Sequence, residues 1–408
     1  MTLVVATVLI DMIGFGIVMP VLPDFIMQLT GDDVAGAARD AGWLAFAFAV
    51  TQFVAAPVMG SLSDRFGRRP VLVAAVAAFA VNYLLTAFAP TLAWLFVGRV
   101  IAGATGASFT TAYAYVTDIS PTDRRTQNFG LLGMAMGVGF VVGPALGGFA
   151  AEWSPRAPFL LAGSIATINA IATWWLLAES LPVEKRRPFS LKRANPVAAI
   201  GRLARDPMLM RIAIAIFLVQ VTFMIMNTIW PFYTVARFGW SGAMIGLSLT
   251  FSGLLSAFVR GGLIRSVIPR WGERRVVIGA IVAQIMAHLV MALGWVGWLM
   301  FAGIAIHSFA GLAYPALSGM ASQRVGPGEQ GELQGAIASL TGLSAIVGPV
   351  LASQIFAAST RTGGSIYLPS APLFGAAILA LCALVTVLAV RDDVRCIRQV
   401  SSHDKAAL

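Results

Sequence analysis

Two charged residues lie inside long apolar stretches of the sequence. Asp11 stands in the stretch 3–23, about 12 Å along a helix, and Arg99 stands eight residues into the stretch 91–117. Of the 18 acidic residues, Asp11 alone lies well inside such a stretch. A buried carboxylate that binds and releases a proton suits proton transport. If the two stretches are antiparallel helices, both residues lie at similar depth, so a salt bridge between them is predicted. The alternative to a role in proton transport is that this pair is purely structural.

Uncharged polar side chains also occur at mid-depth in many of the apolar stretches. Hydrogen bonds between helices account for about half of them. The rest, with the aromatic and methionine side chains of residues 211–233, suit an adaptable pocket for an amphipathic ligand. The predicted pocket residues are Gln52, Asn82, Asn169, Gln220, Phe223, Met224, Asn227, Gln284 and His307.

Twelve apolar stretches must position these side chains. Of the 408 residues, 58% are hydrophobic and 11% are charged, which is too little polar surface for a water-soluble globule. A hydrocarbon core of about 30 Å needs about 20 apolar residues in a helix. We therefore predict an all-α membrane protein with twelve transmembrane helices, the first of them retained. They are expected at residues 3–23, 42–62, 71–89, 91–117, 128–150, 158–178, 211–233, 242–264, 276–294, 297–321, 332–358 and 372–390.

The net charge of +10 has a positional explanation. If both termini are cytoplasmic, 22 of the 28 lysines and arginines fall on that side, and the outer loops hold four. Such an imbalance is the positive-inside rule, so we predict a multi-pass protein of the bacterial cytoplasmic membrane and no nucleic-acid partner. Cys382 lies in the last helix and Cys396 in the cytoplasmic tail, so no disulfide is expected.

The chain divides into two similar halves. The longest charged break predicts a cytoplasmic linker at residues 179–210, between a bundle at 1–178 and a bundle with a short tail at 211–408. An offset of 205 residues relates Gly67 to Gly272, and it recurs at four further sites, including Gly143-Pro144 and Gly348-Pro349. One offset at five sites predicts two six-helix pseudo-repeats with a substrate site between them.

Three motifs narrow the class further. Residues 60–70 read GSLSDRFGRRP and resemble the loop between helices 2 and 3 of the major facilitator superfamily. Residues 137–148 read GVGFVVGPALGG and resemble the helix 5 motif of its proton-driven antiporters. Residues 11–23, DMIGFGIVMPVLP, with Gly98, Arg99 and Gly103, resemble the branch that contains the tetracycline/proton antiporters. The resemblance covers the whole chain and implies proton-coupled drug export.

The loop motif suggests a cytoplasmic gate. A glycine allows close helix contact, and a carboxylate can meet a helix N-terminus or a basic side chain. In the alternative interpretation its arginines only fix the topology. The resemblance adds two partners from the loop after helix 4. The predicted gating residues are Gly60, Asp64, Gly67, Arg68 and Arg69, with Asp118 and Arg125 as those partners.

The helix 5 motif suggests a sliding surface. Gly139, Gly143 and Gly147 recur every four residues and form a smooth stripe, and Pro144 bends the helix. The spacing of these glycines is equally consistent with ordinary close packing between two helices that do not slide. The resemblance of the full motif favours export over import.

Three departures from the tetracycline antiporters bear on the cargo. Asn82, Ser256 and Gln284 stand where those proteins carry acidic or histidine side chains. The loss of these groups predicts weak tetracycline transport and a neutral or cationic cargo, or a different physiological one. Arg260 lies four residues from the predicted end of its helix, where its side chain can reach the interface, so we assign it no role.

The function predicted from these features is secondary antiport of small amphipathic compounds or drugs by a monomer. The proton gradient serves as the energy source, and no cofactor or metal is expected. A proton-coupled importer on the same fold is the first alternative, and a transport-inactive sensor is another. A membrane-embedded enzyme is less favoured, because the histidines at 288, 307 and 403 are scattered and no catalytic triad or metal spacing is present.

Overall fold

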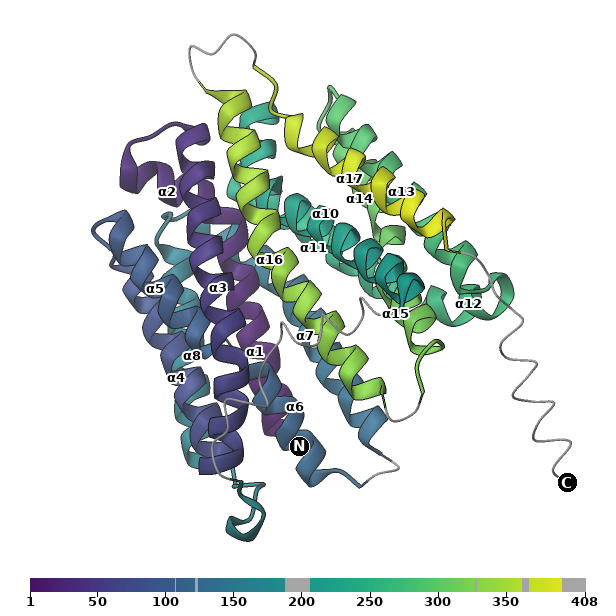
Figure 1. Cartoon of the computed structure of the whole chain (residues 1–408). Helices are drawn as coiled ribbons and strands as arrows, with labels where there is room; N and C mark the ends of the chain where they lie inside the picture. Colours follow the sequence, from purple (N-terminus) through teal and green to yellow (C-terminus); the bar gives the residue numbers. More distant parts are fainter. Residues whose placement is uncertain (107, 122–123, 188–205, 327–328, 362–366, 391–408) are drawn as a thin grey trace, which may run out of the picture.

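The computed structural model describes residues 1–106, 108–121, 124–187, 206–326, 329–361 and 367–390. Much of the predicted linker at 179–210, and the tail with Cys396, lie outside these residues. In the described chain, twelve helical segments are long and apolar enough to cross a membrane, which confirms the predicted number of spans. Figure 1 shows them as two groups of helices, one purple to blue and one teal to yellow.

The spans consist of one or more helices each. Those of the first half are α1 (Thr2–Val18), η1 (Met19–Val21) and α2 (Leu22–Thr30); α3 (Val34–Phe66); α4 (Arg68–Ala87); α5 (Leu92–Thr105) and α6 (Ser108–Ile119); α7 (Arg125–Ala151); and α8 (Ala157–Leu176). Those of the second half are α10 (Pro207–Phe238); α11 (Gly242–Phe258), η4 (Val259–Leu263) and α12 (Ile264–Trp271); α13 (Glu273–Leu293); α14 (Trp298–Ala310) and α15 (Ala313–Ser322); α16 (Gln330–Thr360); and α17 (Ala371–Leu388). The short helix η2 (Val183–Lys185) follows α8.

Helix ends follow from local sequence signals. Asp33 accepts a hydrogen bond from the backbone N–H of Gly36 at 2.9 Å and begins α3. Asp206 does the same for α10 through the N–H of Met208 at 2.7 Å. These caps satisfy backbone donors that a helix leaves free at its start. Glycine in the left-handed conformation ends α10, at Gly239 with φ 63°.

The pseudo-repeat is visible in the backbone. Gly67 and Gly272, 205 residues apart, both have positive φ, 105° and 77°, and each joins two spans by a tight turn. Gly143 packs against α1 in the first half, and Gly348 packs against α10, the corresponding helix of the second half. Each of these glycines precedes a proline inside its helix. The repeated offset therefore marks repeated contacts.

The two halves meet along two helix pairs, α3 with α16 and α7 with α11. A Cβ atom placed on Gly148 of α7 would lie 2.5 Å from the carbonyl oxygen of Gly242 in α11. Likewise, Gly42 near the start of α3 packs against Ser353 of α16. We call these contacts the seal. They join the end of α7 to the start of α11, and the end of α16 to the start of α3.

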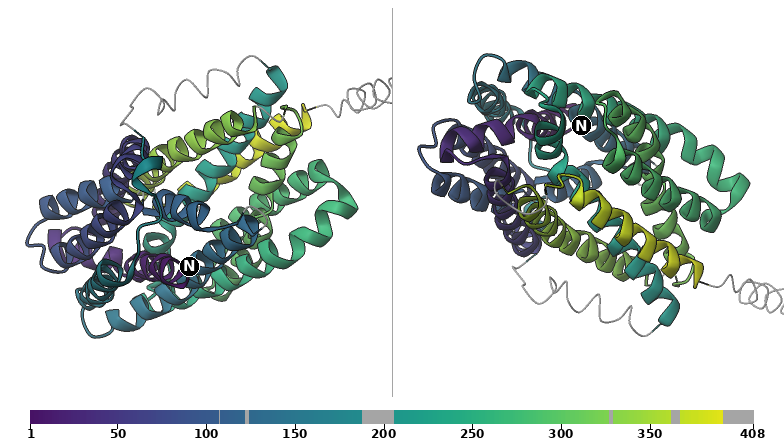
Figure 2. Two further views of the ribbon diagram at one scale, coloured as in Figure 1. Left: turned by 90° about the horizontal axis from the view of Figure 1, so that it is seen from below. Right: turned by 90° about the horizontal axis from the view of Figure 1, so that it is seen from above.

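The opposite ends of the same helices stand apart. Apart from the backbone of its own helix and its neighbours in the chain, no atom lies within 4 Å of a Cβ placed on Gly133 of α7, Gly60 of α3 or Gly335 of α16. In Figure 1 the two groups of helices diverge toward the side where α1 begins and α17 ends, and Figure 2 shows the molecule from both sides. The structure is therefore closed on one side of the membrane and open on the side that carries these chain ends.

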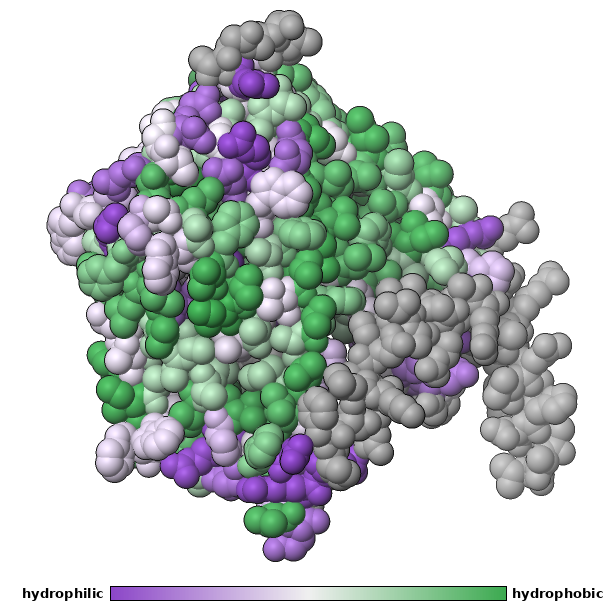
Figure 3. All heavy atoms as spheres, turned by 60° about the vertical axis from the view of Figure 1, so that its left-hand side comes forward, coloured by the Kyte–Doolittle hydropathy of each residue, from purple (hydrophilic) through white to green (hydrophobic). Residues whose placement is uncertain are grey.

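The outer surface matches a lipid environment. Figure 3 shows an apolar belt between two polar zones at the ends of the helices. Large apolar side chains are widely exposed, among them Trp153, Trp175, Trp295 and Trp298 near the ends of spans. Tryptophan is enriched where a membrane protein crosses the lipid–water interface.

Candidate functional site

The carboxyl group of Asp11 is buried within the first half of the molecule. It lies in α1, and Asn169 of α8 donates a hydrogen bond from Nδ2 to its Oδ1 at 3.4 Å. Tyr83 of α4 lies close enough to interact electrostatically with both Asp11 and Arg99. The predicted direct pairing of Asp11 with Arg99 stays a prediction.

The glycine stripe of α7 packs on the helix that carries Asp11. A Cβ on Gly139 would lie 2.6 Å from Cβ of Met12, and one on Gly143 would lie 2.6 Å from the carbonyl oxygen of Ile13. Gly147 lies against Ile17 in the same way. The predicted close helix contact is thus present, and any side chain on the stripe would force α1 away from α7.

A cluster of charges holds the motif loop at the open side. Arg68 contacts Asp64 through Nη1 at 2.6 Å and Asp118 through Nε at 3.0 Å. It also donates from Nη1 to Oγ of Ser63 at 2.6 Å. Arg125 instead donates to the carbonyl oxygen of Ser120 at 3.4 Å. The structure therefore places three of the predicted gating residues in one network, with Arg125 beside it.

Glu179, which sequence reasoning missed, completes this loop. Its carboxylate accepts hydrogen bonds from the backbone N–H groups of Arg68 at 2.8 Å and Arg69 at 3.3 Å. These are the first residues of α4, so Glu179 caps that helix from the end of the sixth span. Arg69 in turn donates to the carbonyl oxygen of Trp174 at 2.8 Å.

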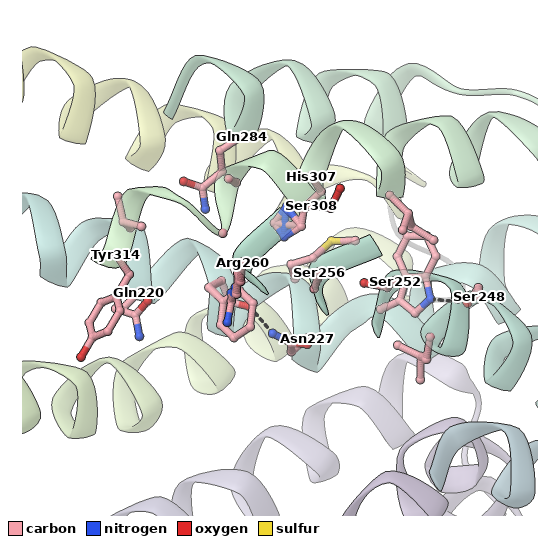
Figure 4. A pocket seen from close by; sticks show the side chains of 18 residues that line it. Gln220, Asn227, Ser248, Ser252, Ser256, Arg260, Gln284, His307, Ser308 and Tyr314 are labelled. Atoms are coloured by element: carbon pink, nitrogen blue, oxygen red, sulfur yellow. Dashed lines mark hydrogen bonds between the residues drawn. The ribbon is translucent and has the colours of Figure 1, made fainter. Parts of the chain in front are cut away.

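A pocket of about 720 Å³, including the part open to solvent, lies in the second half of the molecule (Figure 4). We call it the C-terminal pocket. The predicted residues Gln220, Phe223, Asn227, Gln284 and His307 line it. The other described lining residues are Val219, Met226, Trp230, Ser248, Leu249, Ser252, Ser256, Arg260, Ile304, Ser308, Ala310, Gly311 and Tyr314.

The polar groups of the C-terminal pocket are partly paired with one another. Trp230 donates from Nε1 to Oγ of Ser248 at 2.9 Å. Gln284 donates from Nε2 to Oγ1 of Thr222 at 2.6 Å, but its Oε1 has no hydrogen-bond partner among the described residues. The same holds for Nδ1 of His307. Both atoms are fully buried, and buried polar atoms without partners are unusual.

The other predicted pocket residues lie elsewhere. Gln52 donates to the carbonyl oxygen of Gly106 at 3.3 Å, and Asn82 is buried beside Gly98. Asn169 contacts Asp11 as described, and Met224 packs on Gly348 of α16. These contacts match the alternative of hydrogen bonding and packing between helices.

The position assigned to Arg260 was wrong. The predicted end of its helix was residue 264, but the span continues through η4 and α12 to Trp271. Arg260 therefore lies well before the end of the helix and lines the C-terminal pocket, where its side chain is exposed. It sits in η4, a π-helical turn, and such turns are frequent at functional sites.

Two pseudo-repeated six-helix bundles, closed on one side and open on the other around a polar pocket, define a membrane protein of the transporter class. Residues 4–269 match the profile of the Major Facilitator Superfamily. The chain belongs to this superfamily. It is 36% identical over 380 residues to the tetracycline resistance protein, class C, of Escherichia coli, covering 93% of this chain and 94% of that one. The resemblance to that branch is thereby confirmed.

Solved structures show the same fold. The human organic anion transporter MFSD10 (TETRAN) superimposes with a TM-score of 0.69 at 24% identity, covering 95% of this chain and 98% of the other. The nucleoside transporter NupG gives a TM-score of 0.77 at 14% identity, covering 95% and 98%.

Proposed function

We propose that this chain is a proton-coupled antiporter that exports small amphipathic compounds, including drugs, across the bacterial cytoplasmic membrane. The observation that carries the proposal is the position of Asp11. It is a buried carboxyl group on α1, and α1 packs on the glycine stripe that resembles the antiporter motif. The relatives named as tetracycline resistance proteins support export of a drug-like cargo.

The open side supports uptake of cargo from the cytoplasm. The positive-inside rule assigns the ends of the chain to that side, and the opening faces the same way. Cargo entering the opening would reach the C-terminal pocket. Export then requires the seal to open and the cytoplasmic ends of the helices to close, which is alternating access by a monomer.

The Arg68 network suits the role of gate. Asp64, Arg68 and Asp118 belong to one half of the molecule, and Gly60, one turn before Asp64, faces open space. When the cytoplasmic ends approach each other, this surface is the part of the motif that the opposite half would meet. The network thus fixes the shape of a surface that is used in the other conformation.

Proton coupling through Asp11 is tested by the variant Asp11→Asn. The amide keeps the shape and can still bond to Asn169, but it cannot carry a proton. In inverted vesicles with an imposed pH gradient, we expect gradient-driven accumulation of an exported drug to disappear while the amount of folded protein is unchanged. Asp24→Asn, in the same apolar segment but half-buried near its outer end, is the matched control and should transport normally.

Undiminished gradient-driven transport by Asp11→Asn would remove Asp11 from the mechanism. Movement of cargo in the same direction as the protons, rather than in the opposite direction, would favour a proton-coupled importer on the same fold. The conversion of a test compound into a different product would instead favour a membrane-embedded enzyme.

A further inference from the structure

Arg260 brings an uncompensated positive charge into the C-terminal pocket. It is the one Arg, Lys, Asp or Glu among the described residues that line this pocket. The ion pairs found in the described chain involve Arg39 and Arg68, and both lie in the first half of the molecule. A guanidinium is always protonated, so the pocket is cationic at physiological pH.

The surroundings of Arg260 hold its guanidinium in place. Its Cζ lies 5.9 Å from the centre of the Phe223 ring, over the ring face. Between α14 and α15, Gly311 leaves the space that the guanidinium uses, because a Cβ on that residue would lie 2.7 Å from Nε of Arg260. The π-helical turn η4 carries the residue itself. Three separate elements therefore shape the position of one cation, and Figure 4 shows it near the middle of the pocket.

The Arg260 side chain is exposed in the C-terminal pocket, so its guanidinium is available to a ligand, and its charge favours an anionic one. A carboxylate from the protein would satisfy it, but the described lining supplies none. We propose that the partner is the cargo, and that Arg260 binds the anionic group, such as a carboxylate, of an amphipathic organic anion. The planar fork of a guanidinium donates two parallel hydrogen bonds to such a group.

The remaining lining fits the rest of such a cargo. Trp230, Leu249 and Ile304 provide apolar contact area, and Tyr314 adds an aromatic ring. Ser252 and Ser256, which are partly exposed, supply hydroxyl groups that can bond to a hydroxyl or amide of the ligand.

This proposal rests on the proposed export function and specifies its cargo. It departs from the sequence-based expectation of a neutral or cationic cargo, which rested on the uncharged side chains of Asn82, Ser256 and Gln284. A permanent cation in the pocket disfavours a second cation and favours an anion.

The test is equilibrium binding to the purified full chain in lipid nanodiscs, without any gradient. The probes are radiolabelled naphthoate, naphthamide and naphthylmethylammonium, which share a ring and differ in charge. We expect naphthoate to bind most tightly and the ammonium most weakly. Arg260→Gln should weaken naphthoate binding by about ten- to a hundredfold and leave naphthamide binding unchanged, as expected for loss of a charged hydrogen-bonding partner.

Two further variants separate charge from folding. Arg260→Lys keeps the charge without the planar fork and should retain part of the preference for naphthoate. Arg265→Gln removes an exposed arginine outside the pocket lining and should bind all three probes like the wild type. Retained naphthamide binding by Arg260→Gln shows that this variant is folded.

Equal binding of the three probes, or unchanged naphthoate preference in Arg260→Gln, would overturn the proposal. So would loss of naphthoate binding in nanodiscs that contain anionic phosphatidylglycerol, because the site would then hold a lipid headgroup. A chain that prefers naphthoate through Arg260 but transports nothing against a pH gradient would refute the antiport function and leave the anion site standing.

Discussion

Gly148 offers a direct test of the seal between the two halves. A Cβ at this position would lie 2.5 Å from the oxygen of Gly242, 3.0 Å from Cα of Ala243 and 3.1 Å from the carbonyl carbon of Gly242. All three atoms belong to the backbone of α11, in the opposite half. The variant Gly148→Ala therefore cannot be relieved by turning a side chain, and it should push the halves apart at the seal.

The size of the effect follows from overpacking. Adding a methyl group to a filled contact raises the free energy of the sealed state by about 1–3 kcal/mol. The conformation that is open to the outside lacks this contact, so its population relative to the sealed state should rise by about 5- to 150-fold. The variant is thus expected to shift a conformational equilibrium rather than to unfold the chain.

The assay is labelling of a single cysteine in the C-terminal pocket, Ser256→Cys, with Cys382 and Cys396 replaced. A membrane-impermeant thiol reagent added outside the cell should label this cysteine faster in Gly148→Ala than in the parent. Gly133→Ala is the matched control, because Gly133 lies on the same helix and has open space around it. It should label like the parent.

A neighbouring glycine separates the seal from ordinary packing. Gly147 contacts Ile17 of its own half, so Gly147→Ala should lower thermal stability without increasing labelling from outside. If Gly148→Ala is folded and labels at the parental rate, the contact with Gly242 does not set the equilibrium and the reasoning about the seal is wrong.

Two further predictions concern the gate and the cargo. Asp64→Asn removes a partly exposed ion pair with Arg68, which is worth about 0.5–1 kcal/mol. In the vesicle assay this variant should transport a few-fold more slowly, and in nanodiscs it should bind the probes like the wild type. Loss of probe binding would instead point to a direct contact between Asp64 and the cargo. Expression of the chain in a pump-deficient host should raise tolerance to amphipathic organic acids more than to tetracycline, because Asn82, Ser256 and Gln284 cannot titrate. Strong tetracycline resistance that disappears in Asp11→Asn would contradict this prediction.

The sequence predicted the spans well because lipid imposes a simple rule on them. Every span must be long and apolar, and the charged residues fall between spans. The pocket residues Gln220, Asn227 and Gln284 were predicted for the same reason. A polar side chain in the middle of a span is costly in lipid, so its presence indicates a structural or functional role. The glycine stripe was readable because a period of four residues places Gly139 and Gly143 on one face.

Arg260 and Glu179 were missed for different physical reasons. The stretch 264–271 contains Arg265, Pro269 and Arg270, which are typical of a loop, yet the chain continues from the π-helical turn at Val259–Leu263 into the α-helix α12. No local pattern marks such a turn. Glu179 caps α4 from more than a hundred residues away in the chain, so its role depends on how the sixth span packs beside the third.

The two faces of this molecule should respond differently to salt. The seal consists of backbone and small side chains such as Gly42, Gly148 and Ser353, and the ion pairs defined in the described chain do not cross it. Contacts of this kind are insensitive to ionic strength, and separating them exposes no charge that must be rehydrated. The opposite face, which the positive-inside rule predicts to be cytoplasmic, carries the Arg68 network, whose interactions are screened by salt. We therefore expect the conformational equilibrium to respond more to ionic strength on the face that carries the Arg68 network than on the sealed face.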